Sequence, residues 1–324
     1  MKTLFIISVC ATYCLLACSN TTQSSVGTET ANDTVVDTAM PTDSLHPEEL
    51  PLPSIPDTMR EPALRASYLI QHFWDAMDFS DTLRAHSSAF MEQNFANFVS
   101  VFPYADEASR RNAVSSFLNS ASTDLQTYQL ITSIAEHYLY DPNSPMLDEE
   151  TYILFLEQMV TSPILDSAHI LRLKHQLRFA KLNRPGMTAA DFTYLTRDGD
   201  RTTLHRTDTN ELLLLVFYDP DCEHCQEVIP QIASSSILTD MVNSGRLKIL
   251  AIYADMDSEL WKKTNTELPT SWIVGMDTGN ISNKNLYALR ALPSLYLLDS
   301  NKTVLLKDAP ISMVENYMRG IVSE

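Results

Sequence analysis

The chain has 324 residues, 44% of them hydrophobic, and its formal net charge is −18 at pH 7. Such an acidic chain is repelled by phosphate backbones and by acidic membrane headgroups, so no nucleic-acid partner is expected. The length is sufficient for two globular domains, and the proportion of apolar residues is that of an ordinary globular protein.

The N-terminus has the features of a secretory signal peptide, predicted over residues 1–17. Lys2 supplies positive charge, and an apolar stretch begins at Leu4 and ends in Leu15-Leu16-Ala17-Cys18, which resembles a bacterial lipobox. The stretch is too short to cross a bilayer comfortably, although an ordinary signal peptide or a short transmembrane helix remains the alternative. The pattern predicts lipidation of Cys18, which would anchor the protein without a spanning helix.

Residues 18–62 are predicted to form a disordered tether. Residues 19–62 contain no Phe, Trp or Tyr and are rich in Ser, Thr, Asp, Glu and Pro. Such a stretch cannot bury enough apolar surface to offset the entropy lost on ordering. Residues 19–23 are not acidic and so lack an acidic surface-export signal. We therefore expect a lipid-anchored protein of the cell envelope that faces the periplasm.

Residues 63–183 are predicted to form a helical domain of unknown function. Apolar side chains recur at helical spacing in five segments, separated by Pro103, Pro142, Pro145 and Pro163. The five stripes are Leu69, Phe73 and Ala76; Phe95, Phe98, Val99 and Phe102; Tyr128, Ile131, Ala135 and Leu139; Tyr152, Phe155, Leu156 and Met159; and Leu171, Leu173 and Leu177. Amphipathic helices need one another to bury such stripes, so the aromatic residues are expected to form a core.

No activity is indicated by the helical segment. The stretch from Tyr68 to Asp75 resembles the start of an uncharacterised helical domain that precedes thioredoxin-like domains in Bacteroidota-type lipoproteins. The histidines of the segment are His72, His137, His169 and His175, and none has a partner at metal-ligand spacing. They are interpreted as structural or solvated residues.

Residues 184–324 are predicted to form an α/β domain. Pro185-Gly186 ends the helical pattern, and Asp191–Thr196 and Thr202–His205 are predicted to form a hairpin. The strands expected after it are 211–218, 247–253, 294–299 and 303–307, and helices are expected from Glu223, over Ser258–Thr266 and from Ile311. This β-α-β-α-β-β-α order is that of a thioredoxin fold with an added N-terminal hairpin.

The most informative motif is Cys222-Glu223-His224-Cys225, which follows the apolar run from Leu212 to Tyr218 and opens a predicted helix. Unpaired N–H groups and the dipole at a helix N-terminus favour a thiolate over a thiol. A spacing of two residues lets the sulfurs close and reopen a small disulfide ring. The motif therefore indicates electron exchange through a dithiol.

None of the other cysteines is expected to form a disulfide with Cys222 or Cys225. Cys10 and Cys14 would be removed with the signal peptide, and Cys18 would be lipidated. Cys222 and Cys225 could then pair only with each other within one chain. In an oxidising envelope, such a dithiol is either a disulfide or is kept reduced by a dedicated donor.

Residues 184–324 resemble the thioredoxin superfamily, nearest the membrane-tethered thiol-disulfide oxidoreductases of the TlpA/ResA kind. Three features carry the resemblance: the cysteine pair after a strand, Pro230 in the following helix, and Ala291-Leu292-Pro293-Ser294 before an apolar strand, which matches the family's cis-proline loop. The matching segment covers a little under half of the chain. Pro269 is a rival for the cis-proline, but no apolar strand is expected immediately after it.

The resemblance implies a role for each site residue. Cys222 would be the attacking thiolate and Cys225 the resolving thiol, and Pro293 would present backbone groups to a substrate strand. A protonated His224 would stabilise the thiolate and Glu223 would oppose it. These roles predict a thiol-disulfide oxidoreductase that acts on protein disulfides or dithiols and exchanges electrons with a membrane thiol donor or acceptor.

The sequence also departs from the family pattern. Asp221 stands where many members have Trp, and Val216 stands where thioredoxin has a buried acid. Proton transfer in the resolving step must then involve water or another group. Asp219 and Asp221 are candidates, although a role as turn residues around Pro220 is favoured.

Other interpretations of the cysteine pair remain open. A half zinc site has no second ligand pair, and a structural disulfide would close too short a loop to contribute much stability. A peroxidase would require a cysteine setting that is absent here. The main alternative is an envelope binding or scaffolding lipoprotein in which the thioredoxin-like domain serves interaction. Neither a metal nor a cofactor is expected.

Overall fold

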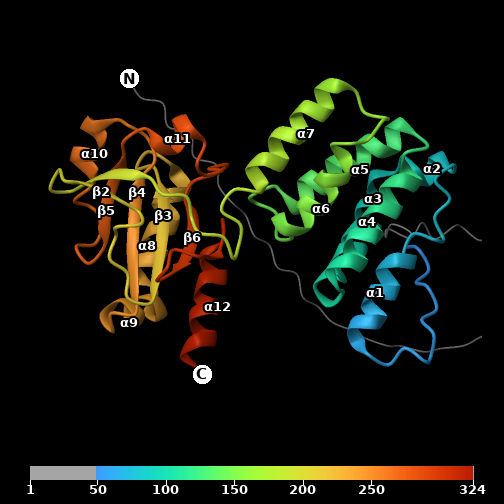
Figure 1. The fold of residues 1–324 in the computed structure, drawn as a ribbon, viewed down its shortest axis with the longest axis horizontal. Helices are drawn as coiled ribbons and strands as arrows, with labels where there is room; N and C mark the ends of the chain where they lie inside the picture. Colours follow the sequence, from blue (N-terminus) through green and yellow to red (C-terminus); the bar gives the residue numbers. More distant parts are fainter. Residues whose placement is uncertain (1–48, 324) are drawn as a thin grey trace, which may run out of the picture. The chain divides into compact units, whose positions relative to one another are not determined.

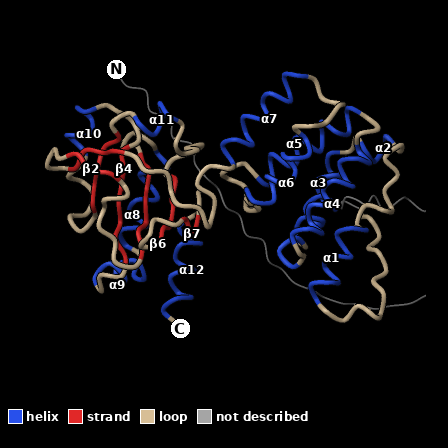
Figure 2. Tube along the Cα trace, viewed as in Figure 1, coloured by secondary structure: helices blue, strands red, loops and turns tan. Residues whose placement is uncertain are grey.

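The computed structural model describes residues 49–323 (Figure 1). The predicted signal peptide, the predicted lipidation site Cys18 and residues 18–48 of the predicted tether lie outside the described residues. Within residues 49–323, no helix combines the length and the apolar character that are needed to cross a membrane. These residues belong to one compact unit, in which a helical region precedes a region built on a mixed sheet (Figure 2).

Acidic and hydroxyl side chains cap the starts of most helices in the helical region. Its helices are α1 (Pro62–His72), α2 (Thr82–Ala85), α3 (Ser88–Ser100), the 3-10 helix η1 (Phe102–Tyr104), α4 (Glu107–Ala121), α5 (Leu125–Leu139), α6 (Glu149–Met159) and α7 (Ser167–Ala180). The side chains that accept a hydrogen bond from the first turn of α2 to α7 are, in order, Asp81, Ser87, Asp106, Asp124, Asp148 and Asp166. Each cap satisfies a backbone N–H that a helix leaves free at its start.

Two of the predicted apolar stripes are wrong in part. α1 ends at His72, so Ala76 lies beyond the helix and is exposed, whereas Ala66 and Ile70 are the buried apolar residues of α1. On α7, Leu173 is buried as expected, but Leu171 is 71% exposed. Helical spacing alone does not show where a helix ends or how much of a face its neighbours cover.

Two further features of the helical region were not predicted. α4 has no counterpart among the expected helices, although Val114 and Phe117 on it are fully buried. In addition, Leu50 is buried, and its backbone N–H donates to Asn94 Oδ1 at 2.8 Å. The packed part of the chain therefore extends into the segment that was predicted to be a tether.

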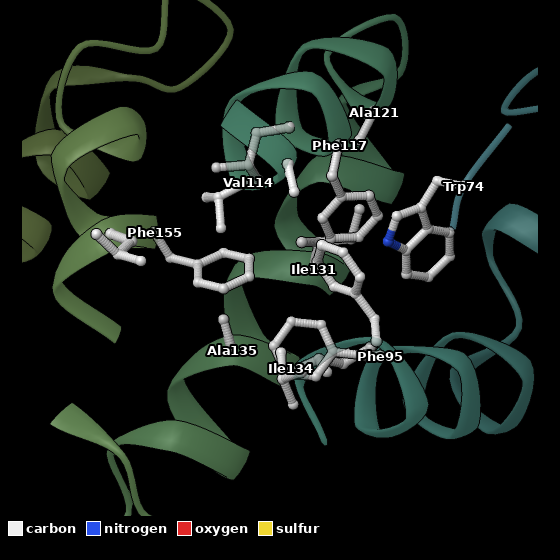
Figure 3. Packing of buried hydrophobic residues seen from close by; sticks show 14 of the residues in the cluster. Trp74, Phe95, Val114, Phe117, Ala121, Ile131, Ile134, Ala135 and Phe155 are labelled. Atoms are coloured by element: carbon white, nitrogen blue, oxygen red, sulfur yellow. The ribbon is translucent and has the colours of Figure 1, made fainter. Parts of the chain in front are cut away.

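The core of the helical region is aromatic. Trp74 stacks on Phe117 with 4.2 Å between ring centroids, and Phe98 meets both rings edge-on. Figure 3 shows the rings of Trp74 and Phe117 facing each other, while Phe155 enters the core from α6. These aromatic stripes form a core, as expected, and not a ligand platform.

The sheet region contains seven strands and the remaining helices. Its elements are β1 (Thr193–Thr196), β2 (Arg201–Thr203), β3 (Leu212–Tyr218), α8 (Glu223–Ser234), α9 (Ser236–Asn243), β4 (Leu247–Tyr253), α10 (Ser258–Thr264), β5 (Ile273–Asp277), α11 (Asn280–Lys284), β6 (Ser294–Asp299), β7 (Val304–Leu306) and α12 (Ile311–Val322). The strand order is β2-β1-β5-β4-β3-β6-β7. β3, β4 and β5 are parallel, and β6 runs antiparallel to β3.

The inner strand β3 is buried along its whole length because both faces of the sheet are covered. Leu214 and Val216 face the apolar cluster that contains residues of α8, α9 and α12. Leu215 and Phe217 face a second cluster with Tyr287 and Tyr296. A strand that is buried on both faces requires the continuous apolar run seen in the sequence.

The predicted strand order is confirmed except for one omission. The hairpin and the strands β3, β4, β6 and β7 lie where they were expected. β5 was not predicted, although it joins the hairpin to the parallel strands by pairing with β1 and β4. It begins four residues after Pro269 and not immediately after it, whereas β6 begins directly after Pro293, which is the proline that has the cis peptide bond.

Candidate active site

The cysteine pair lies at the junction of β3 and α8. Asp219 Oδ1 accepts a hydrogen bond from the Asp221 N–H at 2.9 Å, and the Cys222 N–H donates to the Asp219 carbonyl at 3.2 Å. Asp219 is therefore a turn residue, which was the favoured interpretation. The turn delivers Cys222 to the N-cap position of α8.

The two sulfurs have different surroundings. Cys222 is partly exposed, and its Sγ accepts a hydrogen bond from the Cys225 N–H at 3.4 Å. The Cys222 thiol also donates to the Leu292 carbonyl oxygen at 3.4 Å. Cys225 is only 1% exposed. Cys222 is thus the sulfur that a partner can reach, and a backbone N–H of the first turn of α8 points at it.

Burial raises the pKa of the Cys225 thiol to about 12, against the opposing effect of a hydrogen bond from the Asp219 backbone. A thiol in this state is protonated near neutral pH and is a poor nucleophile until its proton is removed. Val216, which replaces the buried acid of thioredoxin, is itself fully buried among apolar residues. The Val216 side chain cannot accept the proton that Cys225 loses.

The loop before β6 brings Pro293 beside the cysteines. Ser294 at the start of β6 pairs with Phe217 near the end of β3. The Leu292–Pro293 peptide bond is cis, as predicted, and it is the only cis bond within residues 49–323. Pro230 lies inside α8, where the family pattern places it.

Glu223 and His224 lie on the first turn of α8, on its exposed side. The His224 side chain is 62% exposed, and its Nδ1 is 3.4 Å from Glu227 Oε2. Solvent and this carboxylate both screen the charge of a protonated imidazole. The predicted influence of His224 on the thiolate is therefore expected to be weak.

A buried ion cluster beside Pro293 was not predicted. Arg290 Nη2 lies 2.9 Å from Asp308 Oδ2 and 3.3 Å from Glu149 Oε1. Lys307 Nζ lies 2.6 Å from Glu149 Oε2. The side chains of all four residues are between 5% and 15% exposed. Burial raises the pKa of Glu149 and lowers the pKa of Lys307, and each of these residues opposes the shift in the other.

The cluster ties the cis-proline loop to the helical region. Ser294 Oγ donates to Asp308 Oδ1 at 2.8 Å, and Arg290 donates to the Tyr140 carbonyl oxygen. The Arg290 guanidinium also lies over the Tyr140 ring, 3.9 Å from its centroid. The only available sequence signal was the position of Arg290 and Ser294 on either side of Leu292-Pro293.

Within the part of the chain that the structure describes, no group of His, Cys, Asp and Glu side chains could hold a metal ion. The predicted structural histidines make local contacts instead. His72 Nδ1 lies 2.7 Å from Asp75 Oδ2, and His169 Nδ1 lies 2.9 Å from Asp166 Oδ1.

Comparison with known proteins agrees with this architecture. The sequence pattern of a family described as a domain of unknown function (DUF5106) matches residues 17–183. The crystal structure of a thioredoxin-like protein from Bacteroides caccae is 36% identical, with a TM-score of 0.78 over 84% of this chain and 98% of that chain. No curated protein matches the chain.

Two further structures each match a little under half of the chain. The C-terminal domain of an uncharacterized protein from Bacteroides fragilis is 42% identical, covers 42% of this chain and 98% of that chain, and has a TM-score of 0.41. The thioredoxin domain of a thiol-disulfide oxidoreductase from Bacteroides vulgatus is 19% identical, covers 43% of this chain and 98% of that chain, and has a TM-score of 0.37.

The sheet region thus has a thioredoxin-like fold, and the helical region that precedes it lies within the matched domain of unknown function. The chain belongs to the DUF5106 family.

Proposed function

We propose that the chain is a thiol-disulfide oxidoreductase of the TlpA/ResA kind that exchanges electrons with protein disulfides through Cys222 and Cys225. One observation carries the proposal. A partly exposed sulfur at a helix N-terminus faces the Leu292 carbonyl, while a second sulfur is buried one helical turn further along the chain. Two cysteines in such different surroundings suit an attacking role and a resolving role.

The exchange has two steps. The Cys222 thiolate attacks one sulfur of a partner disulfide, forms a mixed disulfide and expels the other partner sulfur as a thiolate. Cys225 then loses its proton and attacks Cys222 Sγ, which forms the Cys222–Cys225 disulfide and releases the second partner thiolate. Two electrons pass to the partner, and a membrane dithiol donor restores the reduced pair. In the oxidising direction the same steps run backwards.

Trapping tests this mechanism. Cys225→Ser removes the resolving thiol, so the variant should retain partner proteins as mixed disulfides on Cys222, and these should be visible as reducible adducts. Cys222→Ser with Cys225 intact is the matched control, and it should retain none. Equal adducts on both variants, or none on either, would contradict the assigned roles.

We further propose that lipid on Cys18 anchors the protein in the cell envelope with its redox domain in the periplasm. The support is the sequence Leu15-Leu16-Ala17-Cys18 at the end of an apolar stretch. Cys18→Ala should release the protein from the membrane fraction. Unchanged retention together with a mature N-terminus that lacks acyl mass would refute this anchor.

A further inference from the structure

We propose that the helical region supplies one wall of the groove in which the partner polypeptide docks for disulfide exchange. This inference rests on the proposed function, because its occupant is the protein segment that carries the reacting sulfur. It also gives the DUF5106 domain a role, which is to select the substrate of the neighbouring redox site.

The groove is a cavity of about 750 Å³ beside the cysteine pair. One wall contains His224 and Val228 from α8 together with Pro293. Since the Cys222 thiol hydrogen-bonds to the carbonyl of Leu292, directly before Pro293, a chain lying along this wall passes next to the attacking sulfur. The cavity therefore borders the cysteine motif through His224 and the cis-proline loop through Pro293, although neither cysteine lines it.

The helical region forms another wall through the segment between α5 and α6. Pro145 and Leu147 line the cavity there, close in sequence to Asp148 at the start of α6. Leu147 is only partly buried and is not a member of the aromatic core. Its side chain is thus available to an occupant of the cavity without being needed for the packing of the helices.

The position of this wall is fixed by the ion cluster. Glu149 follows Leu147 by two residues and binds Lys307 and Arg290, while Arg290 also binds the Tyr140 carbonyl at the end of α5. Both ends of the segment between α5 and α6 are thereby attached to Arg290, which lies three residues before Pro293. A wall held in this way is preorganised, which reduces the entropy lost when a ligand binds.

The lining shows what kind of segment fits. Fourteen of its 24 residues are Pro, Ala, Val, Leu, Ile or Met, so the occupant must present apolar side chains. Met313 on the rim is 46% exposed and adds to this apolar surface. A cavity of this volume takes several residues of an extended chain, whereas a small polar disulfide would leave most of the apolar lining uncovered.

The charges of the lining define the occupant further. Glu149 and Asp308 are matched by Arg290 and Lys307, and Glu150 is matched by Arg184 outside the lining. Asp148 remains as an acidic group of the lining without a cationic partner of this kind, and the whole chain carries a formal charge of −18. The groove therefore suits an extended segment with apolar residues around its cysteine and without acidic ones.

Three disulfides and two matched variants test the groove in the reduced full chain. The substrates are hydroxyethyl disulfide, a peptide disulfide with Leu and Val around the cysteine, and the same peptide with Glu in their place. Leu147→Ser removes an apolar side chain from the groove. Leu171→Ser makes the same change at a residue that is 71% exposed and lies outside the lining.

We expect wild-type protein to reduce the apolar peptide faster than the acidic one. Leu147→Ser should lower kcat/KM for the apolar peptide about fivefold to tenfold, because burial of a leucine side chain favours binding on that scale. The same variant should leave the reduction of hydroxyethyl disulfide unchanged, and Leu171→Ser should leave all three rates unchanged.

The contrary outcomes separate the two proposals. Loss of all three rates to the same extent in Leu147→Ser would mean that the wall supports the redox site and does not dock substrate, which overturns the groove. So would wild-type reduction of all three disulfides at equal rates, or an unchanged rate with the apolar peptide in Leu147→Ser. Wild-type protein that reduces none of the three would overturn the proposed function itself, and the groove with it.

Discussion

The helical region and the sheet region stabilise themselves in different ways. The helical core is built from rings such as Trp74, Phe98 and Phe117, which fix the helices through side-chain packing. The sheet region is organised by β3, whose register with β4 and β6 is fixed by backbone hydrogen bonds. Their apolar clusters share no residue. The cysteine pair follows β3, and the proline loop precedes β6, which pairs with β3, so this register sets where both parts of the site lie.

The two regions nevertheless meet at the site. Arg290 and Lys307 from the sheet region bind Glu149 of α6, and Arg290 binds the carbonyl of Tyr140. The contact is ionic and lies next to Pro293, so it can influence the site without a shared core. The comparison therefore predicts that damage to the helical core and damage to this contact have different consequences.

The largest effect is expected in the helical core. Phe117→Ala removes a ring that is 1% exposed and stacked on Trp74, and it should lower the free energy of unfolding of the helical region by about 3–5 kcal/mol. Because the sheet region has its own core, reduction of hydroxyethyl disulfide should continue. Denaturation followed by Trp fluorescence measures the first effect, and a reduction assay measures the second.

Leu83→Ala is the control for this experiment, since Leu83 is 88% exposed. Its free energy of unfolding should be close to that of the wild type. If Phe117→Ala abolished reduction along with helical stability, the two regions would have to unfold together. Their separate cores would then not make them independently stable.

The ion cluster should give the next largest effect. Glu149→Gln leaves Lys307 without its carboxylate, while Arg290 keeps Asp308. Breaking a buried ion pair typically costs about 3–5 kcal/mol, and the oxygen that Gln retains should limit the loss to about 2 kcal/mol. Chemical denaturation measures the change. The control Glu259→Gln affects an exposed pair with Lys262 and should cost less than about 0.5 kcal/mol. An equal loss in the two variants would show that burial of the cluster is unimportant.

Low pH should have a smaller effect, which acts on the helix caps of the helical region. Hydrogen bonds from Ser109 and Ser67 lower the pKa of Asp106 from its ordinary value of 3.8 to about 2, and bonds from Thr127 and His86 do the same for Asp124. Since the folded pKa lies below the unfolded one, the stabilisation is present above pH 3.8 and is lost as the pH falls through about 2. Asp106→Asn should flatten this dependence in a pH titration of helical stability. An unchanged slope of stability against pH would mean that ionisation of Asp106 does not contribute to acid unfolding.

How much the sequence could predict also differs between the regions. β3, β4 and β6 were recognisable because a strand buried on both faces has a continuous apolar run. β5 has only five residues and contains Gly275, where an added Cβ would meet the Tyr194 ring at 2.3 Å. The lack of a side chain there is a packing requirement, and the interruption of the pattern concealed the strand. The sequence of α4 has no clear apolar stripe because Ser, Asn and Arg interrupt it.

Only the parts of the site that belong to short sequence motifs were predictable. The strand–turn–helix pattern predicted the position of Cys222 and Cys225, and the resemblance to the thioredoxin superfamily predicted that Pro293 lies beside them. The contacts of Arg290 and Glu149 join residues 141 positions apart, and no local pattern encodes them. His224 was expected to tune the thiolate because of its position, but exposure depends on what surrounds the helix, which only the tertiary structure defines.

The smallest effect is expected at His224. Because the imidazole is 62% exposed and lies near Glu227, His224→Pro should make the dithiol couple only slightly more reducing. We expect a change of less than about threefold in its equilibrium constant with glutathione. His224→Gln is the control that removes the charge without adding a helix-restricting ring. A tenfold shift in both variants would show that the charge acts strongly despite its exposure.

The account depends most directly on the claim that Cys222 and Cys225 form one reversible two-electron couple. Equilibration of the protein with mixtures of reduced and oxidised glutathione, followed by alkylation and mass spectrometry, tests this claim. We predict interconversion between a form with two alkylated cysteines and a form with a Cys222–Cys225 disulfide, at a potential between about −270 and −120 mV. A stable glutathione adduct on Cys222 with Cys225 still a thiol, or no change at any ratio, would contradict it.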